Sequence, residues 1–128
     1  MKRSMLILFL LLPPSLCFSK ENRCGWMENP SPANYWLTDK DGEWTISTQG
    51  GGGAAGMDAL VEFPKADFIK TNGDYGYGCA CITVDADDKV KKISTIYQFR
   101  VVPIKQCKND NALKRKTEDI MAELQDTY

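Results

Sequence analysis

An acidic stretch near the middle of the first half carries the residue types of a calcium site. Asp39, Asp41 and Glu43 alternate around Gly42, as at the start of a calcium-binding loop. A complete loop needs further oxygen ligands and a closing acidic residue further along the chain. Here a tryptophan-containing stretch follows at once, so a hairpin turn is favoured over a cation site.

A second acidic group, Asp85, Asp87 and Asp88, could hold a cation in the same way. Three lysines follow it and offset its field: Lys89, Lys91 and Lys92. A solvated turn is therefore expected. Paired carboxylates for glycoside chemistry must face each other across a cleft, whereas the acids that can be placed here lie in turns. We predict no catalytic set, no metal site and no cofactor, and hence no enzyme.

A run of glycines, Gln49 to Gly53, has the composition of a phosphate-binding loop. It lacks the Gly-Lys-Ser/Thr ending and the strand-to-helix context of such loops. Together with Ala54 to Gly56 it is predicted to be a flexible loop outside any regular element. Because function concentrates on loops held by a rigid scaffold, Gly51 and Gly52 are candidate partner-binding residues.

The composition excludes several classes of function. The chain of 128 residues has no histidine, so His-dependent triads and the commonest zinc and copper ligand are absent. Without Lys2 and Arg3 of the leader, 14 basic residues remain against 17 acidic ones, a net charge of about −3. That balance gives no sign of a phosphate-tracking surface, and nucleic acid is not an expected partner.

The first nineteen residues have the layout of a secretory signal peptide. Lys2 and Arg3 precede an apolar run, Met5 to Leu12, which is far shorter than the roughly 20 residues of a membrane-spanning helix. Cleavage after Ser19 is favoured. Lipid attachment at Cys17 is the alternative, although Leu16 before it departs from the usual lipoprotein pattern. A periplasmic or secreted protein is predicted, with no transmembrane segment in the mature chain.

The mature chain keeps four cysteines, Cys24, Cys79, Cys81 and Cys107. An even number in a small exported domain indicates a disulfide framework. Two cysteines in a Cys-X-Cys strand point the same way, too far apart for a bridge. Cys24 and Cys107 are therefore predicted to pair with one member of Cys79 and Cys81 each, in either order. Each bridge would contribute roughly 3–4 kcal/mol; a zinc site or a redox dithiol fits the spacing less well.

The elements that position these residues are mostly strands. Residues 35–38 and 43–48 form a predicted hairpin around the turn 39–42, after a turn region rich in Pro and Asn from Glu28 to Asn34. Pro64 could open a helical turn that directs Phe68 and Ile69 inward. A return strand is expected from Lys92 to Ile104, before Cys107.

The central strand is predicted from Tyr75 to Val84. Its alternation puts Tyr75, Tyr77 and the two cysteines on one face and small residues, from Gly76 to Ala80, on the other. Small residues in a row indicate that another backbone or a large ring packs there, and the tryptophans are the candidates for that ring.

The tail has apolar residues at helical spacing and predicts an amphipathic helix capped by Asp110 or Asn111. The apolar positions are Leu113, Thr117, Ile120, Met121, Leu124 and Tyr128. The expected fold is α+β: a small antiparallel sheet of four or five strands, two disulfides and a C-terminal helix. The predicted division is a signal peptide (1–19), a disulfide-stapled β-rich domain (20–108) and the helix (109–128).

Aromatic side chains are the remaining candidates for a binding surface. They could fill the core of a small sheet, or form a partly exposed surface that anchors a protein or a glycan. The residues proposed for partner binding are Trp26, Trp36, Trp44, Tyr75 and Tyr77.

Five segments resemble a family of small exported bacterial proteins, domain of unknown function 4087. They are Cys24 to Trp26, Glu28 to Asn34, Trp36 to Trp44, Gln49 to Gly51 and Lys70 to Cys81. The resemblance implies an envelope protein of a Gram-negative bacterium and brings no activity or binding residues with it. The helical tail is an addition to the family pattern.

The prediction for function is a non-catalytic binding protein of the bacterial envelope, an inhibitor or immunity-type factor for a protein such as a wall hydrolase or a toxin. One alternative is a structural or accessory envelope protein that assembles through its C-terminal helix. A carboxylate-dependent hydrolase using Asp39 or Asp41 is the third hypothesis.

Overall fold

The computed structural model describes residues 10–11 and 20–126. The predicted cleavage site after Ser19, the lipidation candidate Cys17 and the last apolar position of the tail, Tyr128, lie outside the described residues.

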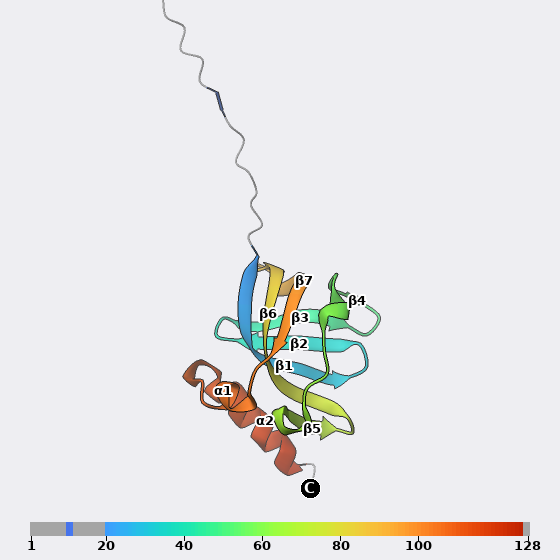
Figure 1. Cartoon of the computed structure of the whole chain (residues 1–128), viewed down its shortest axis with the longest axis vertical. Helices are drawn as coiled ribbons and strands as arrows, with labels where there is room; N and C mark the ends of the chain where they lie inside the picture. Colours follow the sequence, from blue (N-terminus) through green and yellow to red (C-terminus); the bar gives the residue numbers. More distant parts are fainter. Residues whose placement is uncertain (1–9, 12–19, 127–128) are drawn as a thin grey trace, which may run out of the picture.

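Seven strands, two α-helices and three short 3₁₀ turns make up the described chain (Figure 1). The strands are β1 (Glu21–Ser31), β2 (Asn34–Asp39), β3 (Gly42–Thr48), β4 (Gly52–Gly53), β5 (Phe68–Asn72), β6 (Tyr75–Asp87) and β7 (Lys92–Val101). The helical elements are η1 (Met57–Ala59), η2 (Lys65–Asp67), α1 (Ile104–Lys108), η3 (Asn111–Leu113) and α2 (Lys114–Asp126). The predicted α+β class and the C-terminal helix are confirmed, with more strands than the four or five expected.

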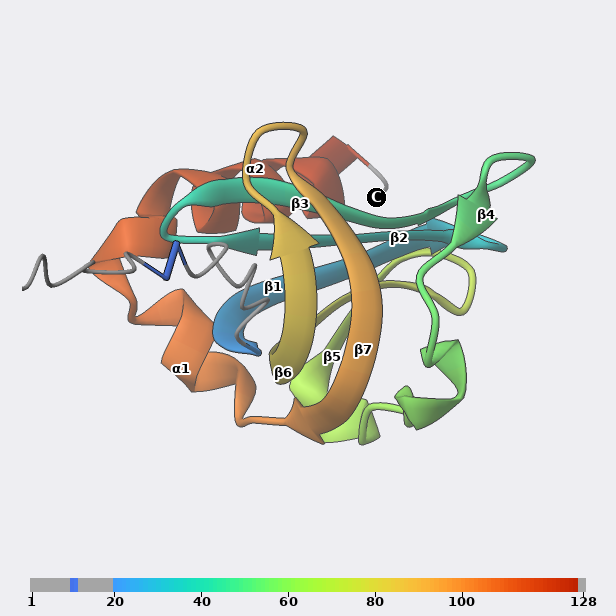
Figure 2. The same ribbon diagram turned by 90° about the horizontal axis from the view of Figure 1, so that it is seen from above.

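Five of the strands close into a barrel. Strand β1 pairs with β2 on one side and with β6 on the other, β2 pairs with β3, and β6 pairs with β7, all antiparallel. The circuit closes where β3 meets β7 in parallel, at Thr45 and Lys92. The order β1-β2-β3-β7-β6-β1 is the strand connectivity of an OB-fold barrel. Figure 2 shows the strongly curved strands.

The glycine run completes this closure, so the prediction of an irregular flexible loop is wrong. Strand β4 pairs with β3, and the N–H of Ala54 donates to the carbonyl of Ile46 at 2.9 Å. Ala55 then bridges to Thr95 of β7 in parallel. Gly56 is required here because a Cβ would lie 2.0 Å from the Ile96 carbonyl oxygen. The glycines therefore let the chain pass between two strands rather than leave the sheet.

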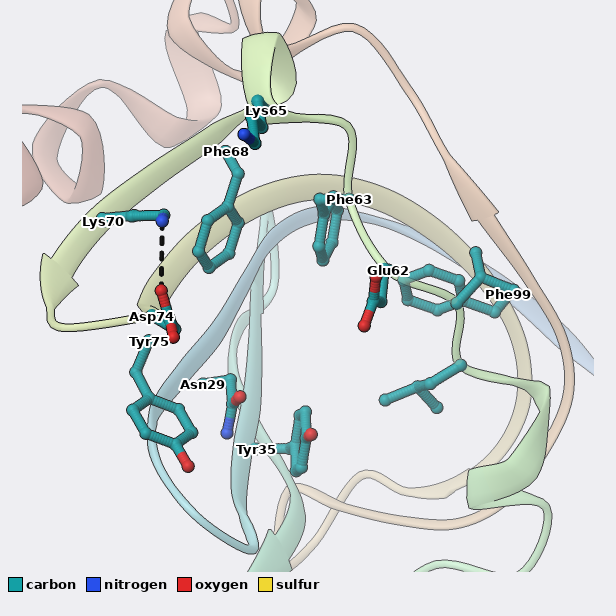
Figure 3. Close-up of a pocket in the computed structure, with 12 residues that line it drawn as sticks. Asn29, Tyr35, Glu62, Phe63, Lys65, Phe68, Lys70, Asp74, Tyr75 and Phe99 are labelled. Atoms are coloured by element: carbon teal, nitrogen blue, oxygen red, sulfur yellow. Dashed lines mark hydrogen bonds and ion pairs between the residues drawn. The ribbon is translucent and has the colours of Figure 1, made fainter.

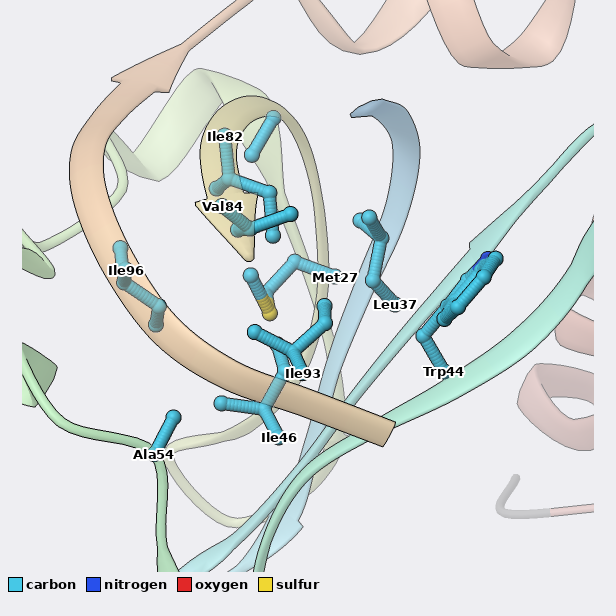
Figure 4. Close-up of a cluster of buried hydrophobic side chains, with 10 residues drawn as sticks. Met27, Leu37, Trp44, Ile46, Ala54, Ile82, Val84, Ile93 and Ile96 are labelled. Carbon is cyan, nitrogen blue, oxygen red and sulfur yellow. The ribbon is translucent and has the colours of Figure 1, made fainter. Parts of the chain in front are cut away.

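The barrel interior is filled by apolar side chains from every strand of the circuit (Figure 4). The buried cluster contains Met27, Leu37, Trp44, Ile46, Ala54, Ala80, Ile82, Val84, Ile93 and Ile96. The predicted hairpin is confirmed, since β2 and β3 pair around the turn that follows Asp39. Trp44 and Ile46 point inward from β3 as its alternation requires.

The alternation predicted for β6 is confirmed from Gly76 to Val84, whereas Tyr75 lines a pocket together with Phe63. The ring that covers the small residues of the inner face is a phenylalanine. On the inner face, a Cβ at Gly78 would lie 2.3 Å from the ring of Phe63, and one at Gly76 would lie 1.8 Å from the carbonyl oxygen of Ile69. A ring and a backbone thus both pack there. No tryptophan fills the groove, since the atoms nearest to a Cβ at Gly76 or Gly78 belong to Ile69, Lys70 and Phe63.

The outer face of β6 carries both disulfides. The structure decides between the two pairings that the sequence left open. Cys24 and Cys81 are directly opposite each other on β1 and β6 and form one bridge. Cys79 bonds to Cys107, which lies in α1. The exclusion of a Cys79–Cys81 bridge is confirmed. The second bridge ties the helical tail to the barrel wall, and α1 and α2 lie together beside it (Figure 1).

Two boundaries differ from the expectation. The predicted turn region from Glu28 is strand up to Ser31, because Pro30 falls at a register shift where no ladder hydrogen bond is needed. The predicted return strand ends at Val101, and Pro103 starts helix α1 instead. In the part of the chain that the structure describes, no helix has the length and apolar character to cross a membrane.

We predict that Gly76→Ala destabilises the barrel by about 2–3 kcal/mol, because the new methyl group has to displace backbone rather than a flexible side chain. Gly73→Asn is the matched control. Gly73 has φ +58 and nothing within 4 Å of a Cβ, and asparagine tolerates that backbone conformation, so its cost stays below about 1 kcal/mol. Urea unfolding followed by circular dichroism measures both. Equal stability of the two variants would show that β5 does not fold over β6.

Candidate functional site

One end of the barrel opens into a pocket of about 680 Å³ (Figure 3). It lies where β1 finishes, β2 begins and β6 begins, and the segment 60–65 passes across it. We call this opening the mouth. Its volume is within the roughly 300–1,000 Å³ of small-ligand sites, and barrel mouths are a common place for them. The lining residues are Asn29, Tyr35, Leu60, Val61, Glu62, Phe63, Lys65, Phe68, Lys70, Asp74, Tyr75 and Phe99.

A cluster of phenylalanines forms one wall of the mouth. Phe63 stacks on Phe68 with ring centroids 5.6 Å apart, and meets Phe99 edge-on at 5.7 Å. The turn at Pro64 and η2 places Phe63 and Phe68 side by side, and the bare backbone of Gly78 leaves room for the Phe63 ring. Such aromatic pairs are geometrically specific, so this wall is preformed.

The facing wall carries aromatic rings with polar tips. Tyr35 and Tyr75 stand on either side of Asn29 in Figure 3, and both are half-buried. The Asn29 amide nitrogen donates to the carbonyl oxygens of Ser31 and Asn34, each at 2.8 Å. These two bonds fix the amide and leave its oxygen as an acceptor toward the pocket.

The rim of the mouth is charged but balanced. Lys70 and Asp74 form an ion pair at 3.1 Å with exposed side chains, while Glu62 and Lys65 are exposed beside them. Exposed pairs of this kind add little stability. The rim therefore contributes two ammonium groups and two carboxylates and no net charge.

The opposite end of the barrel is sealed by Trp44, which is fully buried. The guanidinium of Arg23 lies 3.8 Å from its ring centroid and the ammonium of Lys91 lies 4.5 Å from it. Its indole nitrogen donates to Asp39 Oδ1 at 3.0 Å. Cation–π contacts of this type stabilise a desolvated ring, and Trp44 with these two cations covers this end of the interior.

Asp39 is fully engaged at the sealed end. Its Oδ1 also accepts the backbone N–H of Asp41 at 2.9 Å, and its Oδ2 accepts from Arg23 at 2.9 Å. A hydrogen bond from Lys40, and then one from Arg23, holds the pKa of Asp41 below its ordinary value. These carboxylates close a hairpin turn, as predicted, and neither faces a cleft.

Three of the five aromatic residues proposed as an exposed partner surface are buried, so that part of the prediction is wrong. Trp26 and Trp44 have no exposed surface and Tyr77 is 4% exposed. Trp36 and Tyr75 are half-buried, while Gly51 is exposed on the turn before β4 and Gly52 is exposed at the start of β4. Only Tyr75 of the proposed set lies in the mouth.

Two of these buried aromatics, Trp26 and Tyr77, dock helix α2 on the barrel instead. The Trp26 indole nitrogen donates to Thr117 Oγ1 at 2.9 Å. The Tyr77 hydroxyl lies 2.8 Å from Glu28 Oε1 and 2.9 Å from Glu123 Oε2. Burial, followed by the bond to Glu28, raises the pKa of the Tyr77 hydroxyl well above its ordinary value.

The sequence did not predict most of the residues that line the mouth. Tyr35, Phe63 and Phe99 come from a strand start, an irregular segment and a strand end, and no periodic pattern joins them. Three signals did point to the mouth. The small-residue face of β6 correctly indicated a ring at Gly78 without identifying it as Phe63. Pro64 indicated a helical turn with Phe68 directed inward, and Tyr75 was among the candidate binding residues.

A family model described as a protein of unknown function (DUF4087) matches residues 18–114. The chain belongs to this family. Membership covers the whole barrel, the mouth and the four cysteines, and ends at the first residue of α2. No curated protein and no solved structure matches the chain.

The described residues of this family member contain no group of three or more His, Cys, Asp or Glu side chains placed to hold a metal ion. The acidic groups at 39–43 and 85–88 lie in or beside hairpin turns. We therefore take the mouth, whose chemistry is aromatic and hydrogen-bonding, as the candidate site.

We predict that Asp39→Ala lowers the free energy of unfolding by about 3 kcal/mol, because it leaves Arg23 and the Trp44 indole without their buried partner. Asp41→Ala removes a carboxylate that is 41% exposed and should cost less than about 1 kcal/mol. Chemical denaturation monitored by tryptophan fluorescence measures both. Similar losses for the two variants would contradict the assignment of Asp39 to the seal.

Proposed function

We propose that this protein is an exported, non-catalytic binding protein that holds its ligand in the mouth. The observation that carries the proposal is the preformed aromatic pocket of about 680 Å³ at the open end of a barrel whose other end is sealed. The barrel supports it as a rigid scaffold, closed by strand pairing and stapled by two disulfides.

The arrangement of acids favours binding over catalysis. The general acid of a glycoside hydrolase is a carboxyl group kept protonated by an apolar environment. Glu62 and Asp74, the carboxylates of the mouth, are both exposed, and Asp74 is paired with Lys70. Asp39 and Asp41, the earlier candidates for hydrolysis, serve the seal at the other end.

Export is supported by the two disulfides, which form and persist in oxidising compartments, and by the signal-like leader of the sequence. The narrower prediction of an inhibitor or immunity-type factor requires a protein partner that inserts a segment into the mouth. Assembly through the C-terminal helix draws no support from its packing, because Leu113 and Ile120 are buried against the barrel.

The test compares two exposed valines at opposite ends of the barrel. Val61 is 57% exposed and lines the mouth, whereas Val90 is 67% exposed in the turn between β6 and β7. Immobilised mature protein is incubated with cell-envelope extract, and bound molecules are identified by mass spectrometry. We expect Val61→Arg to lose a ligand that wild type and Val90→Arg both retain, because the guanidinium blocks the opening.

Retention of the same ligand by Val61→Arg would place binding elsewhere and contradict the proposal. Turnover of a bound molecule by wild-type protein would contradict its non-catalytic part. Thermal unfolding of both variants serves as the control that each is folded.

A further inference from the structure

The mouth has a composition that selects among ligand classes. Seven of its twelve lining residues carry a polar or charged side-chain group, with the two tyrosine hydroxyls included, which makes it a poor site for a purely apolar molecule such as an acyl chain. The two lysines and two carboxylates of the rim cancel. A strongly anionic or cationic ligand would gain little net electrostatic energy from such a rim.

The polar groups of the mouth offer donors and acceptors together. The ammonium groups of Lys65 and Lys70 donate, the carboxylate of Glu62 and the amide oxygen of Asn29 accept, and the tyrosine hydroxyls do both. A ligand hydroxyl group also donates and accepts, so several hydroxyls on one ligand can be satisfied at this rim. Uncharged polyhydroxy compounds have this property.

The aromatic rings complete the match. A pyranose ring has an apolar C–H face and hydroxyls at its edge, so it can pack its face on an aromatic ring while the edge hydroxyls reach polar groups. Phe63, Phe68 and Phe99 supply apolar surface, and Tyr35 and Tyr75 present rings with polar tips across from them (Figure 3). The wall of phenylalanines and the wall with the polar tyrosine tips thus face each other across the pocket.

The surroundings of the mouth disfavour a protein partner. Specific protein interfaces bury roughly 1,600 Å² and have an apolar centre that extends over several residues. Among the described residues, the large hydrophobic side chains that are exposed are Leu10, Leu11, Val61, Val90 and Tyr97. Only Val61 of these lines the mouth, so apolar contact ends at the pocket and a compact ligand fits better than a protein surface.

We propose that the mouth binds the end of an uncharged oligosaccharide chain. This inference rests on the proposed function, because it names the ligand of the same site. The end of a chain is specified because the interior behind the pocket is filled by the packed core, so that a chain cannot pass through the barrel.

The test is calorimetric titration of the disulfide-bonded mature protein with tri-N-acetylchitotriose, maltotriose and cellotriose. A neutral hexapeptide mixture and phosphatidylcholine vesicles are the competing arms. We expect at least one saccharide to bind saturably with a dissociation constant below about 1 mM. Val61→Arg and Tyr75→Ala should each weaken it by at least about tenfold, and the matched variants Val90→Arg and Tyr97→Ala by less than about twofold.

Ring signals of Tyr35 and Tyr75 in the NMR spectrum provide a second readout, since saccharide contact shifts them and leaves Tyr97 unchanged. Absence of saturable saccharide binding, or binding insensitive to Val61→Arg, overturns the inference. If a peptide or a lipid instead occupies the mouth in a Val61-dependent manner, the saccharide inference fails while the proposed function stands. Ligands bound only elsewhere overturn both.

Discussion

Strand β6 determines most of this structure, because its inner face must be nearly free of side chains at one end and its outer face must carry the two cysteines that form the disulfides. Its inner face is nearly bare at Gly76 and Gly78, so a neighbouring backbone and the Phe63 ring can approach it closely. Its outer face holds Cys79 and Cys81, which fix β1 and helix α1 to it. A side chain of ordinary size on the inner face would open the barrel, and loss of the outer cysteines would remove the covalent ties that hold the first strand and the tail to β6.

The curvature of the barrel and the presence of a pocket follow from the same close approaches. Because Ile69 folds over Gly76, β5 bends across the open end and brings Phe68 beside Phe63. The sealed end is built differently, with one indole held between two cations and anchored by a buried carboxylate. The barrel thus has a polar closure at one end and an aromatic pocket at the other.

The sequence predicted the parts of the fold that obey a short period. Alternation in β6 assigned its faces, and strand geometry excluded the Cys79–Cys81 bridge. The remainder depended on contacts between distant segments. From the sequence alone Pro30 predicts a turn, because the register shift in β1 that accommodates it is not visible there. The glycine run likewise predicts a loop, because its pairing with β3 and its passage between β3 and β7 are visible only in the structure. For the tryptophans the sequence left core filling and an aromatic surface both open, and burial behind Thr117 and Arg23 makes Trp26 and Trp44 structural. The pocket is built from phenylalanines and tyrosines of four unconnected segments.

The direction of β1 determines which end of the barrel lies next to Lys20. This strand starts at the sealed end, where Glu21 pairs with Val84, and finishes at the opening, where Asn29 pairs with Gly76. Any tether or fusion joined ahead of Lys20 would therefore hold the barrel at its sealed end, with the mouth directed away from the point of attachment. The same polarity makes that terminus the suitable one for surface immobilisation.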